Sequence, residues 1–235
     1  MIIMYNSCSL ILIKGLILNK FKLIGLVLIF AGTLNGCGSL NNALAQKSKT
    51  VEYYRIFDIQ TDSDRATVIN AASNGLGQNI NSANESTPIP NFSTPPEQSG
   101  RFFLVNPFAG SNMASLAAAN GVSLKVATCD GAVWVAQATR EIENSSTLKL
   151  TSCLWQYKNG YHLDVYASFN KKTGGIMQIS RSMSDAMVGT SEEWTEKTFL
   201  DIVREIRKET DAKITYLEGY PKMHGTPWLD AEDGV

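Results

Sequence analysis

The chain has 235 residues, 44% of them hydrophobic, which is enough to bury the core of one domain of ordinary size. Its 21 lysine and arginine residues are balanced by 22 aspartate and glutamate residues, for a formal net charge of −1. This balance disfavours broad nucleic-acid binding, which needs basic patches that neutralise phosphates, and it disfavours electrostatic docking on anionic lipid.

The first 36 residues have the composition of an export signal, because they carry three lysines and no acidic residue. The apolar run at 23–34 has the length of about 7–15 residues that is typical of a signal-peptide core. It is shorter than the roughly 20 residues that a bilayer-spanning helix needs. The run ends in a small residue followed directly by a cysteine, within Leu34-Asn35-Gly36-Cys37.

This motif, Leu34-Asn35-Gly36-Cys37, resembles the lipobox of bacterial lipoprotein precursors, in which the cysteine becomes lipidated. The resemblance implies cleavage before Cys37, a diacylglyceryl thioether on its sulfur and usually a third acyl chain on its new amine. Two chains suffice for stable anchoring. Gly38 in place of an aspartate implies the outer membrane, with the domain facing the periplasm. The alternatives are an uncleaved anchor, or a secreted protein that is cut nearby and keeps Cys37 free.

The composition after the signal predicts a tether, one domain and a tail. Residues 37–50 are small and polar and are expected to form a flexible tether. The single domain is expected at 51–218, and the tail at 219–235 is expected to be exposed and loosely ordered. Four of the seven prolines lie in 79–100 among Asn, Ser and Thr, which predicts a disordered loop within the domain.

Hydrophobic patterning within 51–218 predicts an α+β fold. Aromatic and β-branched residues on both faces predict a strand at 51–60 that lies inside a sheet. The polar residues 61–64 supply caps for a helix that ends near Gly75 or Gly77. These two glycines follow a helix rather than a strand, and a third glycine is absent, so they indicate a helix stop and not a dinucleotide loop.

A short strand at 102–105 and a short helix at 111–120 are expected next. From Val122 the alternation of apolar and polar residues predicts an antiparallel β-meander of about five strands joined by short turns. The strands are expected at 122–126, 132–139, 148–155, 161–169 and 176–183. Cys129-Asp130-Gly131 is expected to form the first hairpin turn.

A long helix at 191–210 is expected to cover this meander. Thr190 and Glu193 have the spacing of a capping box, and an apolar stripe follows on one face of the helix. A last strand is expected at 214–217. The predicted architecture is therefore an antiparallel β-meander of about five strands packed by one or two helices.

Two cysteines, Cys129 and Cys153, remain if Cys8 is removed with the signal and Cys37 is acylated. An even pair in an oxidising compartment predicts a disulfide. If the strands of the two cysteines flanked the strand at 132–139, their backbones would lie about 10 Å apart, which is too far to bridge. The bridge therefore requires that the two strands adjoin, or that Cys129 folds over the end of that strand.

The alternative for these residues is a thiol-dependent hydrolase or transferase. Cys129 would be the nucleophile and His162 its base, with Asp164 or Asp130 as the orienting group. Two histidines in the whole chain exclude a site of several imidazoles, and no Cys-x-x-Cys pair, phosphate loop or paired-histidine zinc motif is present. No metal or cofactor is therefore predicted.

Aromatic residues are concentrated in the meander, where they either line a ligand groove or form the core. They are Trp134, Trp155, Tyr157, Tyr161 and Tyr166. Aromatic residues in strands are more often core residues and cross-strand partners, so the core interpretation is favoured.

Together these observations predict a lipid-anchored cell-envelope protein with a non-enzymatic binding or assembly role. The expected partners are the membrane, through the lipid on Cys37, and an envelope protein or small ligand that the sequence does not identify. A purely structural spacer fits the same features. No nucleic-acid partner is expected.

Overall fold

The computed structural model describes residues 47–80, 82–142, 146–173 and 190–229, all within one compact unit that spans Gln46–Val235. Its elements, in chain order, are β1 Lys47–Gln60, α3 Arg65–Gly77, β2 Ala83–Ser86, β3 Phe103–Val105, α4 Asn112–Ala119, β4 Val126–Thr128, β5 Trp134–Ile142, β6 Ser146–Tyr157, β7 Gly160–Thr173, α6 Ser191–Thr210 and β8 Lys213–Tyr220. The lipobox with Cys37 and the strand expected at 176–183 lie outside the described residues.

The main sheet has six strands in the order β2-β5-β6-β7-β1-β8, and every neighbouring pair is antiparallel. Strands β5, β6 and β7 form the predicted meander, and β1 lies inside the sheet between β7 and β8, as its two apolar faces suggested. A second, two-stranded sheet pairs β3 with β4. The α+β fold with an antiparallel meander is therefore confirmed.

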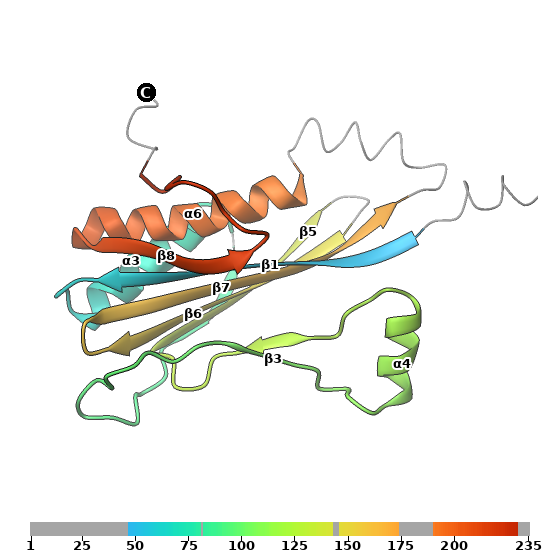
Figure 1. Cartoon of the computed structure of the whole chain (residues 1–235), viewed down its shortest axis with the longest axis horizontal. Coiled ribbons are helices and arrows are strands. Elements are labelled where there is room, and N and C mark those ends of the chain that lie inside the picture. Colours follow the sequence, from blue (N-terminus) through green and yellow to red (C-terminus); the bar gives the residue numbers. More distant parts are fainter. Residues whose placement is uncertain (1–46, 81, 143–145, 174–189, 230–235) are drawn as a thin grey trace, which may run out of the picture. The chain divides into compact units, whose positions relative to one another are not determined.

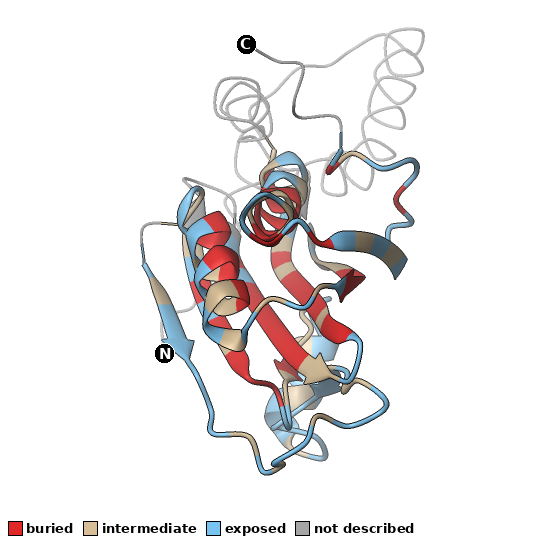
Figure 2. Ribbon diagram, turned by 90° about the vertical axis from the view of Figure 1, so that its left-hand side faces the viewer, coloured by how far each residue is buried: buried red, intermediate tan, exposed pale blue. Residues whose placement is uncertain are grey.

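Helices α3 and α6 lie on one face of the main sheet, and β3, α4 and β4 lie on the other (Figure 1). Buried residues, red in Figure 2, concentrate where the two helices meet the sheet. The predicted stripe of α6 is fully buried there: Phe199, Ile202, Val203 and Ile206. This arrangement leaves the second face of the sheet free of large helices.

The first turns of α3 and α6 are capped by the side chains that the sequence predicted. The Asp64 carboxylate accepts hydrogen bonds from the backbone amides of Ala66 and Thr67. At α6, the amide of Glu193 donates to the Thr190 hydroxyl at 3.1 Å, and the Thr190 amide donates to the Glu193 carboxylate at 2.8 Å. Each bond satisfies a backbone amide that has no partner inside the helix.

Gly75 marks the closest approach of α3 and α6. A Cβ at this position would lie 2.6 Å from the carbonyl oxygen of Asp201 and 2.6 Å from the Cα of Ile202. The backbones of the two helices therefore touch, and α3 continues to Gly77. Gly75 is a packing residue inside the helix, so the helix stop lies at the second glycine of the pair.

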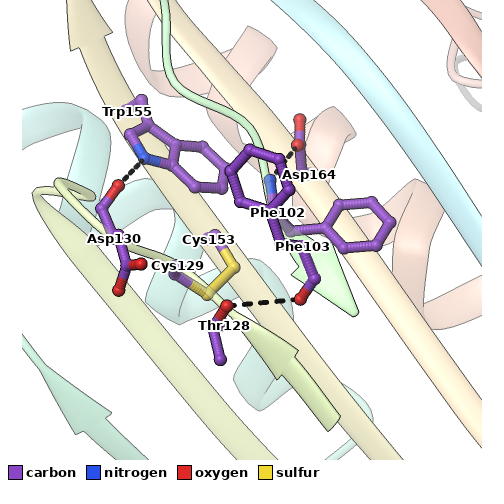
Figure 3. The surroundings of a disulfide bond; sticks show 8 residues. All are labelled: Phe102, Phe103, Thr128, Cys129, Asp130, Cys153, Trp155 and Asp164. Atoms are coloured by element: carbon purple, nitrogen blue, oxygen red, sulfur yellow. Dashed lines mark hydrogen bonds between the residues drawn. A yellow bond between two sulfur atoms is a disulfide. The ribbon is translucent and has the colours of Figure 1, made fainter. Parts of the chain in front are cut away.

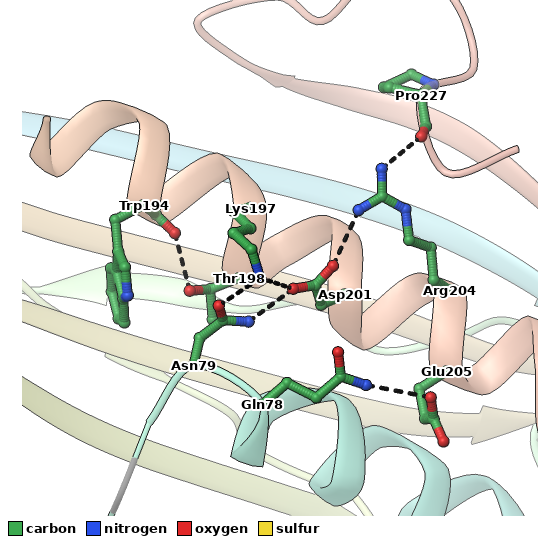
Figure 4. A network of polar contacts seen from close by, with 9 residues as sticks. All are labelled: Gln78, Asn79, Trp194, Lys197, Thr198, Asp201, Arg204, Glu205 and Pro227. Carbon is green, nitrogen blue, oxygen red and sulfur yellow. Dashed lines mark hydrogen bonds and ion pairs between the residues drawn. The ribbon is translucent and has the colours of Figure 1, made fainter. Parts of the chain in front are cut away.

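The carboxylate of Asp201 joins α6 to Asn79, just after α3, and through Arg204 it is connected to the C-terminal segment (Figure 4). It accepts hydrogen bonds from Asn79 at 2.8 Å, Lys197 at 2.6 Å and Arg204 at 2.9 Å. Burial alone would raise the pKa of Asp201, but these bonds outweigh burial and hold the pKa below its usual value. Arg204 also donates to the carbonyl oxygen of Pro227 at 2.8 Å.

The prediction that the chain is exposed and loosely ordered from residue 219 onward was wrong for the first part of this tail. Strand β8 extends to Tyr220, and the side chains of Met223 and Trp228 are buried. The Trp228 ring meets Phe57 edge-on, with 5.5 Å between ring centroids. The tail therefore adds Met223 and Trp228 to the main core beside Phe57, which local composition does not show.

Two segments expected to lack structure contain strand. Strand β1 begins at Lys47 rather than at Val51, because its first residues pair with the end of β7, from Lys47 with Thr173 onward. The loop expected at 79–100 contains β2, which pairs with the edge of β5. Both are polar strands that backbone pairing creates, so neither has an apolar alternation in its sequence.

The strand expected at 122–126 was placed in the wrong sheet. Only Val126–Thr128 is strand, and it pairs with β3 instead of β5. The turn at Cys129-Asp130-Gly131 does form, with the Ala132 amide donating to the Cys129 carbonyl and Gly131 at a φ of 77°. This turn joins the small sheet to the main sheet.

Candidate functional site

The helix-free face of the main sheet gathers most of the titratable side chains singled out from the sequence. Asp58 on β1 pairs with His162 on β7, and Asp164 on β7 pairs with Cys153 on β6. Because side chains alternate along a strand, all four side chains point away from the helices. Residues 96–130 cross this face, so its centre is covered by chain rather than by a helix.

The predicted disulfide between Cys129 and Cys153 is present, with 5.8 Å between the two Cα atoms (Figure 3). The distance is short because β4 lies over the helix-free face instead of within the main sheet. Next to the bridge, the indole of Trp155 donates to the Asp130 carbonyl at 2.9 Å, and Gly100 lies directly against its ring. The crossing segment is thus held to β6 covalently and by contact.

Asp164 is a buried carboxyl at the centre of this face, with 1% of its surface exposed. Its Oδ2 accepts a hydrogen bond from the Phe102 amide at 3.0 Å, and its Oδ1 has no partner among the described residues. Burial raises the pKa of Asp164 from 3.8 to about 7, against the smaller opposing effect of the Phe102 bond. The Phe102 ring covers the site, 5.8 Å from the rings of both Tyr54 and Tyr166.

A second polar cluster surrounds Asp58 nearer the sheet edge. The Tyr157 hydroxyl donates to Asp58 Oδ1 at 2.6 Å, and Gln60 donates to Oδ2 at 3.0 Å. His162 Nε2 lies 3.4 Å from the same Oδ1. Burial and the Asp58 bond raise the pKa of Tyr157 to about 12. Burial also lowers the pKa of His162, which outweighs the attraction of Asp58, so the imidazole is mainly neutral at pH 7.

These contacts bear on the thiol-dependent alternative. That hypothesis requires a free Cys129 thiol, and in the structure this sulfur is bonded to Cys153. His162 and Asp164 share one face because they lie two residues apart on β7, but they have separate partners. His162 faces Asp58, and Asp164 holds the Phe102 amide. Within the described ranges, no group of three or more His, Cys, Asp or Glu residues is arranged to hold a metal ion.

Residues 103–126, here called the arm, form the part of the crossing segment that contains β3, α4 and the start of β4. The arm meets β1 through Thr50, whose amide donates to the Gly121 carbonyl at 3.0 Å. The Thr50 hydroxyl accepts from the Ser123 amide at 2.7 Å. These bonds hold the arm beside the beginning of β1.

A cavity of about 460 Å³, here called the arm cavity, lies between the arm and the sheet. Apolar side chains of the arm form its wall: Pro107, Phe108, Val122, Leu124 and Val126. Hydroxyl and amide groups of the sheet form much of its floor: Thr50, Thr147, Ser168 and Asn170. Lys125 and Lys149 also line it. Lys125 lies 3.8 Å from Glu52, whereas Lys149 forms no ion pair with any carboxylate in the described ranges.

The outer surface of the arm is apolar and exposed. No residue of α4 is buried, and Leu116 and Met113 on this helix are 67% and 57% exposed. Phe103 on β3 is 63% exposed. Lys125 is the single charged residue in the arm sequence. This surface was not predicted, although the long run with a single charged residue that marks it can be read from the sequence.

The aromatic residues of the meander belong mainly to the core, as favoured. Trp134, Trp155, Tyr161 and Tyr166 are at most 4% exposed, and Tyr157 is half-buried against Asp58. None of these five lines the arm cavity. The stacking-groove interpretation therefore finds no support at these positions.

Among the helices in the described ranges, none is long and apolar enough to cross a membrane. Compared with known protein families and with curated proteins, the chain matches none.

Proposed function

We propose that this chain is a lipid-anchored cell-envelope protein that binds a small ligand in the arm cavity and does not act as an enzyme. The observation that carries the proposal is the composition of the cavity, which combines an apolar wall, a hydroxyl-rich floor and two lysines. Small-molecule sites are typically concave, mainly apolar, and carry a few convergent polar groups.

The lining favours a particular class of ligand, namely an anionic group that carries an apolar chain or ring. Lys149 supplies a positive charge and forms no ion pair with a carboxylate in the described part of the chain. The wall residues Phe108, Leu124 and Val126 would cover the apolar part of such a ligand. The hydroxyls of Thr147 and Ser168 add hydrogen-bonding groups that would fix its orientation.

The titratable groups on the same face support binding rather than catalysis. Nucleophilic catalysis needs an activated nucleophile within hydrogen-bond reach of a base. Cys129 is bonded to Cys153, and His162 faces Asp58 on a sheet face that the crossing segment covers. The cavity itself is lined by lysines, hydroxyls and apolar groups, and no histidine, cysteine or carboxylate is among its lining residues.

The anchor rests on the lipobox resemblance and on Cys37, with the outer membrane and a periplasm-facing domain as the proposed location. We expect Cys37→Ala to block processing and to remove the protein from the washed membrane fraction. Cells that produce the full chain, fractionated and blotted, provide the measurement. If the variant migrates and fractionates like the wild type, the lipoprotein assignment is wrong.

Ligand binding is tested with 8-anilinonaphthalene-1-sulfonate, an anionic aromatic fluorophore, and with dodecyl phosphate as a competitor. The folded protein should bind the fluorophore saturably, and dodecyl phosphate should displace it. Lys149→Gln should weaken binding about 5–10-fold, since one charge-assisted contact contributes about 1–1.5 kcal/mol. Lys213→Gln, on exposed β8 outside the cavity lining, is the matched control and should bind like the wild type. Equal effects of the two substitutions, or no saturable binding, would refute the cavity as the site.

A further inference from the structure

We propose that the outer surface of the arm lies in the lipid–water interface of the membrane that holds the anchor. The proposal rests on the lipid anchor of the proposed function and goes beyond it, because it concerns a different surface from the cavity. Its first support is the set of exposed apolar side chains on the arm that do not line the cavity: Phe103, Val105, Met113 and Leu116, each more than 40% exposed. Large apolar side chains that gather exposed on one segment indicate an interaction surface.

The charge of the arm indicates the kind of partner. Over 103–126 the sequence carries no acidic residue and one basic residue, Lys125, which lies 3.8 Å from Glu52. A surface of this composition has almost no charge with which to recognise a charged protein partner. Phenylalanine, leucine and methionine between serine and asparagine residues suit an interface in which apolar groups enter lipid and polar groups stay hydrated.

The position of the arm relative to the start of the domain is the second, independent support. The arm is bonded to the beginning of β1, because Thr50 pairs with Gly121 and Ser123 at 3.0 Å and 2.7 Å. Cys37 precedes Lys47, the first residue of β1, by ten residues, and ten residues reach at most about 35 Å. The tip of the arm, with Met113 and Leu116 on α4, therefore lies at the end of the domain where β1 begins (Figure 1).

The arm is also held in place, which a membrane-contacting element requires. The disulfide at Cys129 follows directly after β4, and the Phe102 amide is bonded to buried Asp164 just before β3. Both ends of the arm are thus fixed to the main sheet, while α4 at its tip has no buried residue. A rigid stem with an apolar tip presents that tip to lipid without unfolding.

The test places a tryptophan at the tip and asks whether acyl chains reach it. Leu116→Trp and, as a second site, Met113→Trp are made in the full chain, which is exported, purified and placed in vesicles of phosphatidylcholine with brominated acyl chains. Ile89→Trp is the matched control, because Ile89 is 95% exposed and lies outside the arm. The wild-type signal, from Trp134, Trp155, Trp194 and Trp228, is subtracted.

We expect the bromines to quench Leu116→Trp and Met113→Trp at least 2-fold more than Ile89→Trp. Equal quenching of tip and control positions overturns the proposal. Tip emission that is shifted to the blue but not quenched also overturns it, because a protein surface or a second copy then covers the arm. Mass spectrometry of Cys37 is read separately. If Cys37 carries lipid and the tip is not quenched, this inference fails while the anchor stands; if Cys37 carries no lipid, the anchor fails first.

Discussion

The buried carboxyl of Asp164 gives the protein an unusual dependence of stability on pH. Burial raises its pKa from 3.8 to about 7, so the folded state keeps this proton over a range in which the unfolded state has lost it. Below about pH 4 both states are protonated and the group contributes nothing. From pH 4 to 7 the folded state loses about 1.4 kcal/mol of stability per pH unit, and above pH 7 a penalty of about 4 kcal/mol remains.

Asp164→Asn removes this penalty, because an asparagine stays neutral at every pH. Its amide oxygen can still accept the Phe102 hydrogen bond. Its amide nitrogen would occupy the place of Oδ1, which has no partner among the described groups, at a cost of about 1–3 kcal/mol. We therefore expect the variant to be less stable than the wild type by that amount at pH 4, and more stable by about 1–3 kcal/mol at pH 8.

Urea unfolding followed by tryptophan fluorescence at pH 4, 6 and 8 measures the difference between variant and wild type, provided that the m-values agree. Asp130→Asn is the control, because Asp130 is exposed and lies next to Cys129 of the disulfide on the same face of the sheet. Its effect should be small and should not change sign with pH. The reasoning is refuted if Asp164→Asn destabilises the protein equally at pH 4 and pH 8, since the buried carboxylate would then carry no ionisation penalty.

Two further predictions concern the packing that holds the site. Replacing both Cys129 and Cys153 with serine should lower the free energy of unfolding by about 3 kcal/mol, because the unfolded chain then regains the entropy of a loop of 24 residues. Thiol labelling of the native wild type should be negligible until reductant is added. Gly75→Ala should destabilise the protein by about 2 kcal/mol, because its Cβ would meet the backbone of Asp201 at 2.6 Å. Gly77→Ala, with open space around it, should stabilise the protein by about 0.5–1 kcal/mol in the same unfolding assay. Equal effects of the two alanines would contradict the close packing of α3 against α6 at Gly75.

The elements that the sequence predicted well are those whose pattern is local. Helix α6 combines a capping box at Thr190 with a periodic apolar stripe, and both features form within a few turns of the chain. Strands β6 and β7 alternate regularly and are joined by the tight turn at Gly160, whose φ is 139°. In these segments local propensity and the burial pattern agree, so the sequence alone identifies them.

The elements that were missed depend on partners distant in the sequence. Strand β2 is polar and exists because β5 offers it an unpaired edge. Trp228 is buried because it packs against Phe57, which lies far earlier in the chain. The segment 122–126 alternates regularly between apolar and polar residues and was therefore placed in the meander. Its last residue, Val126, instead pairs with β3. Composition cannot show which strand edge or which aromatic ring a segment will contact in the folded protein.

The same distinction holds for the candidate site. The disulfide was predicted from the expected compartment and from parity, because only Cys129 and Cys153 would remain if Cys8 were removed with a signal and Cys37 were acylated. The cluster around Asp58 could not be predicted, since Asp58 meets His162 only through the register of β1 against β7. The high pKa of Asp164 has the same origin, because it requires the crossing segment to bury the carboxyl.

The arm is difficult to explain as a contribution to the fold. Its two-stranded sheet is small, and an isolated hairpin of that kind is marginally stable in water. Its helix buries no residue, so the apolar side chains at its tip add little to the core. Bonds at Cys129 and Phe102 hold its two ends, and Thr50 holds it at Gly121 and Ser123. Exposed apolar side chains that add little to the fold indicate an interaction surface, and this is the reason for the membrane contact proposed above.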